Sequence, residues 1–323
     1  MGQTLEAGWP EWSRSLAIVC RDYKRPSGLI SMTTDNELCF LESYARWSFT
    51  GSGSIIDLGC WLGATTIALA RGLAQNTLAR DRRVVEGIDR FVWQPWMNTV
   101  TAQLGVRLPY RVGEEFLRDV ERGVAPYGPL VRLRQADLET YAPPDEPIEF
   151  LFIDAIKSWE LADHIARSFF PRLIPGRSLI VQQDFGYHAP VVATAHLMMW
   201  RLRHVFQFVH HVPASCSVVY VMTRRLTSRD IPHLSPMEFK ATDVDEAFEY
   251  SLRCVPKDFW APVLSCKIGF LLERGRGRAA LREAEAFGRR GIKASPNVVA
   301  DVLALAPEHD QSVAGAIGRH LSG

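Results

Sequence analysis

The sequence predicts an α/β protein built on a doubly wound, seven-stranded sheet whose last strands are antiparallel, followed by a C-terminal helical appendage. Short apolar runs of strand length alternate with segments of helical periodicity, which is typical of parallel sheets. Four of these runs end in an aspartate, and the loops after parallel strands line one crevice of such a sheet. The last two runs are joined without room for a helix, so they should pair antiparallel.

The stretch 55–66 is the clearest unit of strand, loop and helix. Residues 55–58 are a buried strand that contains Asp57, and residues 64–74 have a helical pattern. Glycines and threonines stand in the loop and the first helical turn: Gly59, Gly63, Thr65 and Thr66. Glycine permits backbone angles that other residues avoid, and hydroxyls with free N–H groups at a helix start suit a carboxylate or phosphate. Asp57 could accept from an ammonium group; the alternative is a turn that only packs the helix on the strand.

The other elements follow in the same alternation. A capping box from Thr34 to Glu37 begins the first helix. Further strands are expected at 83–89, 130–135, 148–154, 177–185, 206–211 and 217–223. Further helices are expected at 114–122, 159–169 and 190–204. The aromatic residues within 91–97 either wall a pocket or belong to the core, and both interpretations stay open.

The composition argues against several classes of function. Of the residues, 47% are hydrophobic, which is enough for a large core. The formal net charge is +1, which argues against a broad positively charged surface for nucleic acid. The 6 cysteines are scattered without a C-x-x-C pair, as in proteins of a reducing compartment. No apolar run is long enough to span a bilayer, and no secretory signal is recognised. We therefore expect a cytoplasmic protein with no nucleic acid and no membrane partner.

The spacing Asp57-x-Gly59-x-x-x-Gly63 resembles the first motif of class I S-adenosylmethionine-dependent methyltransferases. It lacks the middle glycine of the dinucleotide-binding pattern G-x-G-x-x-G, because Trp61 stands there. The resemblance implies a Rossmann-like methyltransferase fold, S-adenosylmethionine as cofactor, and Asp89 at the next strand end as acceptor of the ribose hydroxyls. The residues that it assigns to the cofactor are Asp57, Gly59, Trp61, Gly63, Thr65, Thr66, Asp89, Arg90, Asp137, Leu138, Asp154 and Ile156.

The chain is expected to divide into three parts. These are an N-terminal arm at 1–33, an S-adenosylmethionine-dependent methyltransferase-like domain at 34–225 and a helical appendage at 226–323. The appendage carries alanine, leucine and arginine at helical spacing, interrupted by glycines. Such helices need another surface to cover them. Either they form a lid on their own chain or they pair in a homodimer, and both alternatives stay open.

The segment from Asp154 to Lys157 resembles the D-x-x-K motif of catechol and caffeoyl-CoA O-methyltransferases. In those enzymes the aspartate is a metal ligand and the lysine is the general base. The segment is also similar to that of macrolide-sugar O-methyltransferases, which carry histidine where Lys157 stands, and of the related cephalosporin hydroxylases. In these groups the next strand ends in two further metal ligands. The resemblance thus implies a Mg²⁺ site formed by Asp154, Gln183 and Asp184, weakened because Gln183 is neutral.

Two arrangements are open for this corner of the sheet, because Asp154 and Asp184 should end neighbouring strands and repel each other unless a cation lies between them. In the first, which we favour, Mg²⁺ is the cation and Lys157 accepts the proton of the substrate hydroxyl. In the second, the ammonium of Lys157 is the cation and another residue is the base, with His188 the nearest in sequence. The catalytic candidates are therefore Lys157, Asp154 and His188.

The function that these patterns favour is transfer of a methyl group from S-adenosylmethionine to a hydroxyl of a small molecule, a sugar or a phenolic natural product. The alternative is a protein on the same fold that binds S-adenosylmethionine without methylating, as a scaffold or a hydroxylase-like relative. A nucleic-acid methyltransferase is not expected, because the sequence has no Asn-Pro-Pro-aromatic or Pro-Cys motif for a flipped base.

Overall fold

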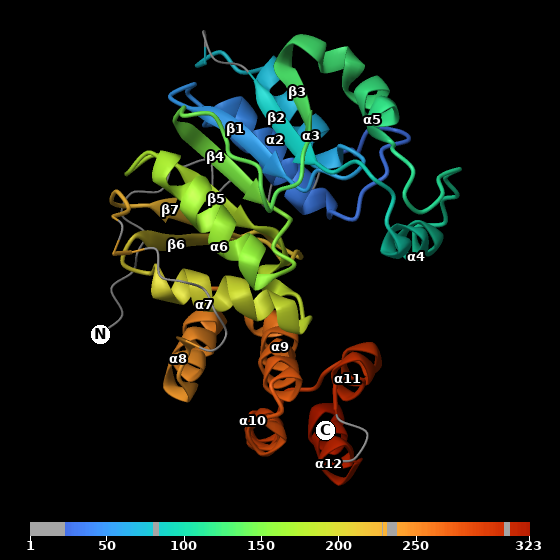
Figure 1. Cartoon of the computed structure of the whole chain (residues 1–323), viewed down its shortest axis with the longest axis vertical. Coiled ribbons are helices and arrows are strands. Elements are labelled where there is room, and N and C mark those ends of the chain that lie inside the picture. The colour runs from blue at the N-terminus through green and yellow to red at the C-terminus, as the bar shows by residue number, and fades with distance from the viewer. Residues whose placement is uncertain (1–22, 80–83, 228, 231–237, 307–310) are drawn as a thin grey trace. The chain divides into compact units, whose positions relative to one another are not determined.

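The computed structural model describes residues 23–79, 84–227, 229–230, 238–306 and 311–323 (Figure 1). It contains a 7-stranded sheet in the order β3-β2-β1-β4-β5-β7-β6. The strands are β1 (Ser54–Leu58), β2 (Val85–Asp89), β3 (Val131–Gln135), β4 (Ile148–Ile153), β5 (Leu179–Gln182), β6 (Phe206–His211) and β7 (Val218–Met222). β1 pairs in parallel with β2 and β4, whereas β6 and β7 are antiparallel. The predicted fold class, a doubly wound seven-stranded sheet with antiparallel last strands and C-terminal helices, is confirmed.

The chain divides by its internal contacts into two compact units. The first unit holds the described residues up to Ala155, together with Ser168–Ile180 and Val212–Ser215. The second unit holds Ile156–Arg167, Val181–His211 and the described residues from Cys216 onward. The expected N-terminal arm lies, up to residue 22, outside the described part of the chain. The first unit therefore contains the ends of β1, β2 and β4, and the second contains the segment that follows β5.

The parallel strands of the first unit end at one edge. β1 lies between β2 and β4, and β3 pairs with β2. The register places Asp57 opposite Gly87 of β2 and Phe152 of β4. Because parallel strands run in one direction, the loops that leave their carboxyl ends are neighbours. The acids at the ends of β1 and β2 are brought together in this way.

Helices α2 (Asp35–Trp47) and α3 (Ala64–Ala74) pack against each other in the first unit (Figure 1). The predicted capping box begins α2: the Thr34 hydroxyl accepts from the Glu37 N–H, and the Glu37 carboxylate accepts from the Thr34 N–H at 2.8 Å. The expected span of the helix after the first strand, residues 64–74, is confirmed. A strong helix-start signal and a long apolar pattern were enough to predict these two elements.

Two helices after β2 differ from the expectation. The sequence pattern does not predict α4 (Pro95–Gln103), because only Met97 and Thr101 of this helix are buried and no regular apolar face marks it. Helix α5 (Leu117–Val124) begins later than the expected residue 114. The Phe116 N–H donates instead to the Phe91 carbonyl at 2.9 Å, which ties the preceding segment to the loop after β2.

Two elements after β4 are shorter than expected. β5 ends at Gln182, and Gln183–Gly186 form the 3-10 turn η3. The Gly186 N–H donates to the Cys216 carbonyl at 2.8 Å, so the chain turns before a longer strand can form. The helix expected at 190–204 is divided into the 3-10 turn η4 (Pro190–Val192) and α7 (Ala193–Arg201).

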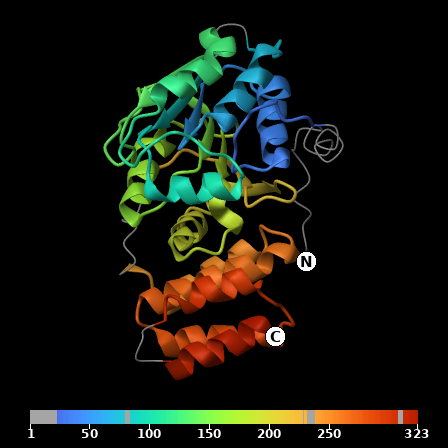
Figure 2. The same cartoon turned by 90° about the vertical axis from the view of Figure 1, so that its right-hand side faces the viewer.

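The second unit contains the β6–β7 hairpin, α6 (Trp159–Ser168), α7 and the C-terminal helices. These last are α8 (Ala241–Leu252), α9 (Trp260–Glu273), α10 (Gly277–Arg289), α11 (Pro296–Leu303) and α12 (Gln311–Ser322). α9 is mostly buried because it contacts α7, α8, α10 and α11, and Figure 2 shows the orange and red helices stacked in layers. The buried Lys267 of α9 lies 2.8 Å from Asp245 and 2.8 Å from Glu283, which joins α9 to α8 and α10. Among the described residues, no helix is long and apolar enough to cross a membrane.

Candidate functional site

The loop from Gly59 to Gly63 passes close over the end of β4. We call it the cofactor loop, because the resemblance noted in the sequence assigns its residues to the cofactor. Gly59 has a φ of 83°, and a Cβ atom on it would lie 2.4 Å from the Asp154 carbonyl oxygen. The Gly59 N–H donates to Ile88 of β2, and the Asp154 N–H donates to Leu58, both at 2.9 Å. Only glycine fits this close approach, since a side chain would meet backbone and the φ is left-handed.

Gly63 begins α3, and its missing side chain makes room for a neighbouring helix. Its φ is 82°, and a Cβ atom would lie 2.9 Å from a methyl carbon of Val120 on α5. The sequence suggested that this glycine lets the helix start approach a ligand. The structure shows that the missing side chain lets α5 pack against the cofactor loop; the approach of a ligand stays a prediction.

Asp57 is fully buried beneath the cofactor loop. Its Oδ2 accepts hydrogen bonds from the hydroxyls of Thr65, at 2.7 Å, and Thr66, at 2.6 Å. Burial raises the pKa of Asp57 to about 6, while the two hydroxyls oppose this rise. Its other oxygen, Oδ1, is buried with no hydrogen-bond partner among the described residues. The threonine hydroxyls therefore orient Asp57, and Asp57 itself offers one open acceptor.

Asp89 joins the cofactor loop to the loop after β2. Its Oδ2 accepts from the Trp61 N–H and its Oδ1 from the Phe91 N–H, both at 2.9 Å. Trp61 and Phe91 have φ values of 44° and 50°, which non-glycine residues rarely adopt and which cost free energy. Burial raises the pKa of Asp89, and the backbone N–H donors oppose this rise. Each oxygen keeps a second lone pair, so this fixed carboxylate can still accept from two hydroxyls.

The residues expected near the adenine form an exposed rim in the first unit. Arg90 Nη2 donates to Asp137 Oδ2 at 2.8 Å, and 53% and 44% of the two side chains are exposed. The hydrogen bond from Arg90 holds the pKa of Asp137 below its ordinary value. The next residue, Leu138, is buried. Such an exposed ion pair adds little stability, which leaves both side chains able to exchange partners.

The aromatic residues after β2 divide between core and surface. Phe91, Trp93 and Met97 are buried in one apolar cluster with the cofactor loop. Trp96, in contrast, is 46% exposed, and its ring centroid lies 6.0 Å from that of Trp61. Most of this segment is therefore core, whereas Trp96 is at the surface, and its role as the wall of a pocket stays a prediction.

Lys157 and Asp184 form an ion pair in the second unit, between Nζ and Oδ2. This contact agrees with one part of the second arrangement left open by the sequence, in which the ammonium of Lys157 is the cation beside Asp184. Gln183 Oε1 is buried and has no hydrogen-bond partner in the described part of the chain. No group of three or more His, Cys, Asp or Glu residues that could hold a metal ion is found in the described ranges.

The expected Mg²⁺ ligands do not fit a hard divalent cation as they are arranged. Asp184 is already neutralised by the ammonium of Lys157, and Gln183 contributes only a neutral oxygen. Magnesium binds mainly through carboxylates, phosphates and water in octahedral geometry. Asp154 follows β4 in the first unit, and Ile156, assigned to the cofactor by resemblance, is buried at the start of the second.

His188 is paired with a residue that the sequence patterns do not indicate. Its Nε2 lies 2.8 Å from Oδ2 of Asp301 on α11, and the rings of His188 and Tyr187 have centroids 4.4 Å apart. Burial raises the pKa of Tyr187; Asp301 and Asp184 add to the rise, and Lys157 opposes it. Both ion pairs are therefore close to the same tyrosine. We call Lys157, Asp184, Tyr187, His188 and Asp301 the polar cluster.

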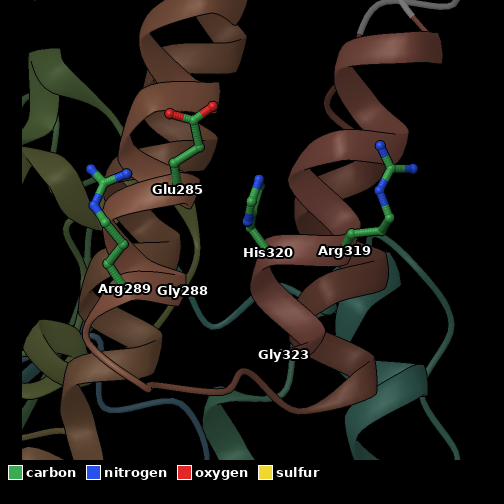
Figure 3. Close-up of a pocket in the computed structure, with 6 residues that line it drawn as sticks. All are labelled: Glu285, Gly288, Arg289, Arg319, His320 and Gly323. Carbon is green, nitrogen blue, oxygen red and sulfur yellow. The ribbon is translucent and has the colours of Figure 1, made fainter.

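A hollow of about 460 Å³ between α10 and α12 contains none of the predicted site residues. Its lining residues are Glu285, Gly288, Arg289, Arg319, His320 and Gly323. In Figure 3, His320 lies in the space between the two helices, whereas the guanidinium groups of Arg289 and Arg319 extend on their outer sides. The charged groups do not converge, so this hollow has no recognisable binding arrangement.

Comparison with known proteins gives likenesses of fold. No family model matches the sequence, and no curated protein matches it. The structure is similar to that of the O-methyltransferase NovP, with 17% identity over 62% of this chain and 84% of that chain and a TM-score of 0.47. It is similar to CalS11, a calicheamicin methyltransferase, with 17% identity over 69% of this chain and 97% of that chain and a TM-score of 0.44. It is also similar to TomG from Streptomyces achromogenes, an O-methyltransferase in complex with S-adenosylmethionine. The identity is 15% over 68% of this chain and 93% of that chain, and the TM-score is 0.35.

Proposed function

We propose that this chain is an S-adenosylmethionine-dependent methyltransferase that acts on a hydroxyl of a small molecule, a sugar or a phenol. The observation that supports the proposal most is the pair of aspartates at the ends of β1 and β2, of which Asp57 is buried and Asp89 half-buried. Asp57 has an open acceptor oxygen, and Asp89 is fixed by two backbone donors on two loops. Carboxylates with perturbed pKa values and spare acceptor capacity are typical of binding sites.

The residues of the first unit fit the chemical groups of S-adenosylmethionine. Asp57 Oδ1 can accept from an ammonium group, which would relieve the cost of holding a buried charge. The free lone pairs of Asp89 suit the two hydroxyls of a ribose. By the stated resemblance, Trp61, Arg90, Asp137 and Leu138 belong beside the nucleoside, and this assignment is part of the proposal.

When bound, S-adenosylmethionine supplies a methyl group on a positively charged sulfur. The chain then has to hold the acceptor oxygen in line with that methyl group and remove the proton of the hydroxyl. The sequence offers Lys157 and His188 as candidates for the proton acceptor. Lys157 is engaged by Asp184, so His188 is the proposed base.

The first prediction of the proposal concerns Asp89. The Asp89→Ala variant should bind S-adenosylmethionine about 1.5–3 kcal/mol more weakly, because hydrogen bonds to a charged acceptor are lost. Isothermal titration calorimetry measures this change directly. Asp35→Asn is the matched control, since this aspartate of the same unit is 56% exposed on its side chain and pairs only with Arg25 among the described residues. Equal affinity in the Asp89→Ala variant and the wild type would reject the assignment of Asp89.

The second prediction concerns the metal. Methyl transfer should continue in excess EDTA, because the Lys157 ammonium already supplies the positive charge beside Asp184. The measurement is the rate of transfer from S-adenosylmethionine labelled in its methyl group, with and without chelator. Loss of activity in EDTA that Mg²⁺ restores would instead support the metal site at Asp154, Gln183 and Asp184, with Lys157 as base.

A second candidate function is binding of S-adenosylmethionine without methyl transfer, and the engaged Lys157 favours it. The two candidates differ in product formation alone. Wild-type protein incubated with labelled S-adenosylmethionine and a panel of phenols and sugars should give a labelled product. Tight cofactor binding with no transfer to any acceptor of the panel or to an extract of the host would favour the non-catalytic function.

A further inference from the structure

Two polar atoms near the end of β1 are buried without a hydrogen-bond partner. They are Oδ1 of Asp57 and Nε1 of Trp61, and neither bonds with any described residue. An ionised carboxylate oxygen only accepts hydrogen bonds, and an indole N–H only donates one. An unpartnered buried polar atom costs about 1–3 kcal/mol, so such atoms are few in folded proteins. Two of opposite kind, in one short stretch of chain, indicate a ligand that offers both a donor and an acceptor.

The ring of Trp61 is held in one orientation. Its backbone N–H donates to Asp89 at 2.9 Å, and its φ of 44° is left-handed. The residue is only 8% exposed, and its ring belongs to the apolar cluster that includes Phe91 and Trp93. The ring of Trp96 lies beside it, with the centroids 6.0 Å apart. Packing therefore fixes the direction of the indole N–H and keeps it from bulk solvent.

The charges in this part of the first unit favour a cation beside Asp57. Burial raises the pKa of Asp57, and the negative charge of Asp89 adds to the rise. A phosphate group at Oδ1 would bring a third negative charge to these two carboxylates, whereas an ammonium group would neutralise Asp57. The free oxygen therefore suits a ligand with an ammonium group better than a nucleotide phosphate.

The indole of Trp61 also replaces the donors that the sequence indicated. A carboxylate at this helix start was expected to meet the hydroxyls of Thr65 and Thr66, but both of these hydroxyls donate to Oδ2 of Asp57. Each hydroxyl has one hydrogen, so neither can donate a second bond. Nε1 of Trp61 remains free to donate among the described residues. The two unpartnered atoms thus match the two charged groups of an α-amino acid.

We propose that Nε1 of Trp61 donates to the carboxylate at the amino-acid end of S-adenosylmethionine, while Oδ1 of Asp57 accepts from the ammonium group of the same end. Trp61 is then a specificity-determining residue that favours ligands with an α-amino acid. Its backbone N–H stays on Asp89, beside the proposed ribose site, and all of these residues belong to the first unit. This inference rests on the proposed function, which places the cofactor at this loop, and deepens it.

The binding test uses the full-length protein with two ligands, S-adenosylhomocysteine and its decarboxylated analogue, which keeps the ammonium group and lacks the carboxylate. Isothermal titration calorimetry gives the ratio of the two affinities. The wild type should prefer S-adenosylhomocysteine, and Trp61→Phe should reduce this preference about 10- to 150-fold, the range for a hydrogen bond to a charged group. The ratio isolates this bond, because a distorted loop would weaken both ligands alike.

Trp93→Phe is the matched control for Trp61→Phe. Trp93 is buried in the same apolar cluster, but its Nε1 already donates to Asn98 at 2.8 Å. This variant loses an indole N–H that has a partner within the chain. Its preference for S-adenosylhomocysteine over the decarboxylated analogue should therefore equal that of the wild type, even if both affinities change.

A spectroscopic readout follows the indole N–H of the wild type directly. Its ¹H–¹⁵N signal is the one missing from Trp61→Phe, and it should shift downfield with S-adenosylhomocysteine but not with the decarboxylated analogue. If S-adenosylhomocysteine binds and Asp57→Asn weakens it, but Trp61→Phe keeps the wild-type preference, the inference is overturned while the proposed function stands. If the wild type does not bind S-adenosylhomocysteine at all, the proposed function fails and the inference fails with it.

Discussion

Replacing Asp57 with asparagine is expected to make the unliganded protein more stable at pH 8 and to weaken its binding of S-adenosylmethionine about 10- to 150-fold. Asp57 is fully buried, and burial raises its pKa to about 6. A rise of about two pKa units corresponds to about 3 kcal/mol of destabilisation of the charged form. We expect the Asn variant to be about 1–2 kcal/mol more stable than the wild type. The gain is smaller than about 3 kcal/mol, because the amide nitrogen that replaces the unpartnered Oδ1 also lacks a hydrogen-bond partner. Binding weakens because the neutral amide cannot pair with an ammonium group.

The pH dependence of this effect has a definite sign. The folded-state pKa of Asp57 lies above its ordinary value of 3.8, so its contribution to stability is present below pH 3.8 and is lost as the pH rises to about 6. The difference in unfolding free energy between the Asn variant and the wild type should therefore grow from pH 4 to pH 7 and then stay constant. Urea denaturation at several pH values measures it.

Asp137→Asn is the control for Asp57. The hydrogen bond from Arg90 holds the pKa of Asp137 below its ordinary value, so removing that charge should not stabilise the protein at any pH. If Asp57→Asn were as stable as the wild type at pH 8 while binding S-adenosylmethionine normally, Asp57 would be neither strained nor part of the cofactor site.

Gly59→Ala is expected to destabilise the first unit by about 2–5 kcal/mol. A left-handed backbone costs an alanine about 1–2 kcal/mol, and overpacking adds about 1–3 kcal/mol. The new methyl group would lie 2.4 Å from the Asp154 carbonyl oxygen, which belongs to backbone and cannot swing aside. The cofactor loop must then move away from β4, so binding of S-adenosylmethionine should fail as well.

Gly28→Ala is the matched control for Gly59. Gly28 has a φ of 78°, close to the 83° of Gly59, but a Cβ atom there would meet nothing within 4 Å. This variant should show the backbone cost alone, about 1–2 kcal/mol, with unchanged affinity for S-adenosylmethionine. Thermal and urea unfolding of both variants measures the difference, and equal destabilisation of the two would contradict the close approach of the cofactor loop to β4.

Most of the sheet could be predicted from the sequence, because its strands are short apolar runs that end in an acid or a turn signal. The first strand, the helix at 64–74 and the antiparallel pairing of β6 with β7 are examples. Helix α4 could not be predicted in this way. Only two of its residues, Met97 and Thr101, are buried, so the usual periodicity of a core-facing helix is missing.

The cofactor side of the candidate site could be predicted in its position but not in its contacts. The strand ends located Asp57 and Asp89. The sequence could not show that the Thr65 and Thr66 hydroxyls are turned toward Asp57, because a hydroxyl at a helix start can face either a ligand or the preceding strand. No sequence pattern predicts that Trp61 adopts a left-handed backbone conformation and donates its N–H to Asp89.

The polar cluster was the least predictable part. The ion pair of Lys157 with Asp184 was one of two alternatives, since charge spacing alone cannot distinguish an ammonium from a metal ion between carboxylates. Asp301 has no sequence signal at all, because it stands 113 residues from His188. Asp301 belongs to α11, a helix in which we recognise no motif. Only the packing of α11 against α9 places Asp301 beside His188.

The most direct test of the central claim is an experimental structure of the protein with S-adenosylhomocysteine, the product of methyl transfer from the cofactor. We expect the nucleoside against the cofactor loop, the ribose hydroxyls on Asp89, and the ammonium group on Asp57 Oδ1. Binding elsewhere on the protein, or no binding at millimolar concentration, would contradict the claim that Asp57 and Asp89 form the cofactor site.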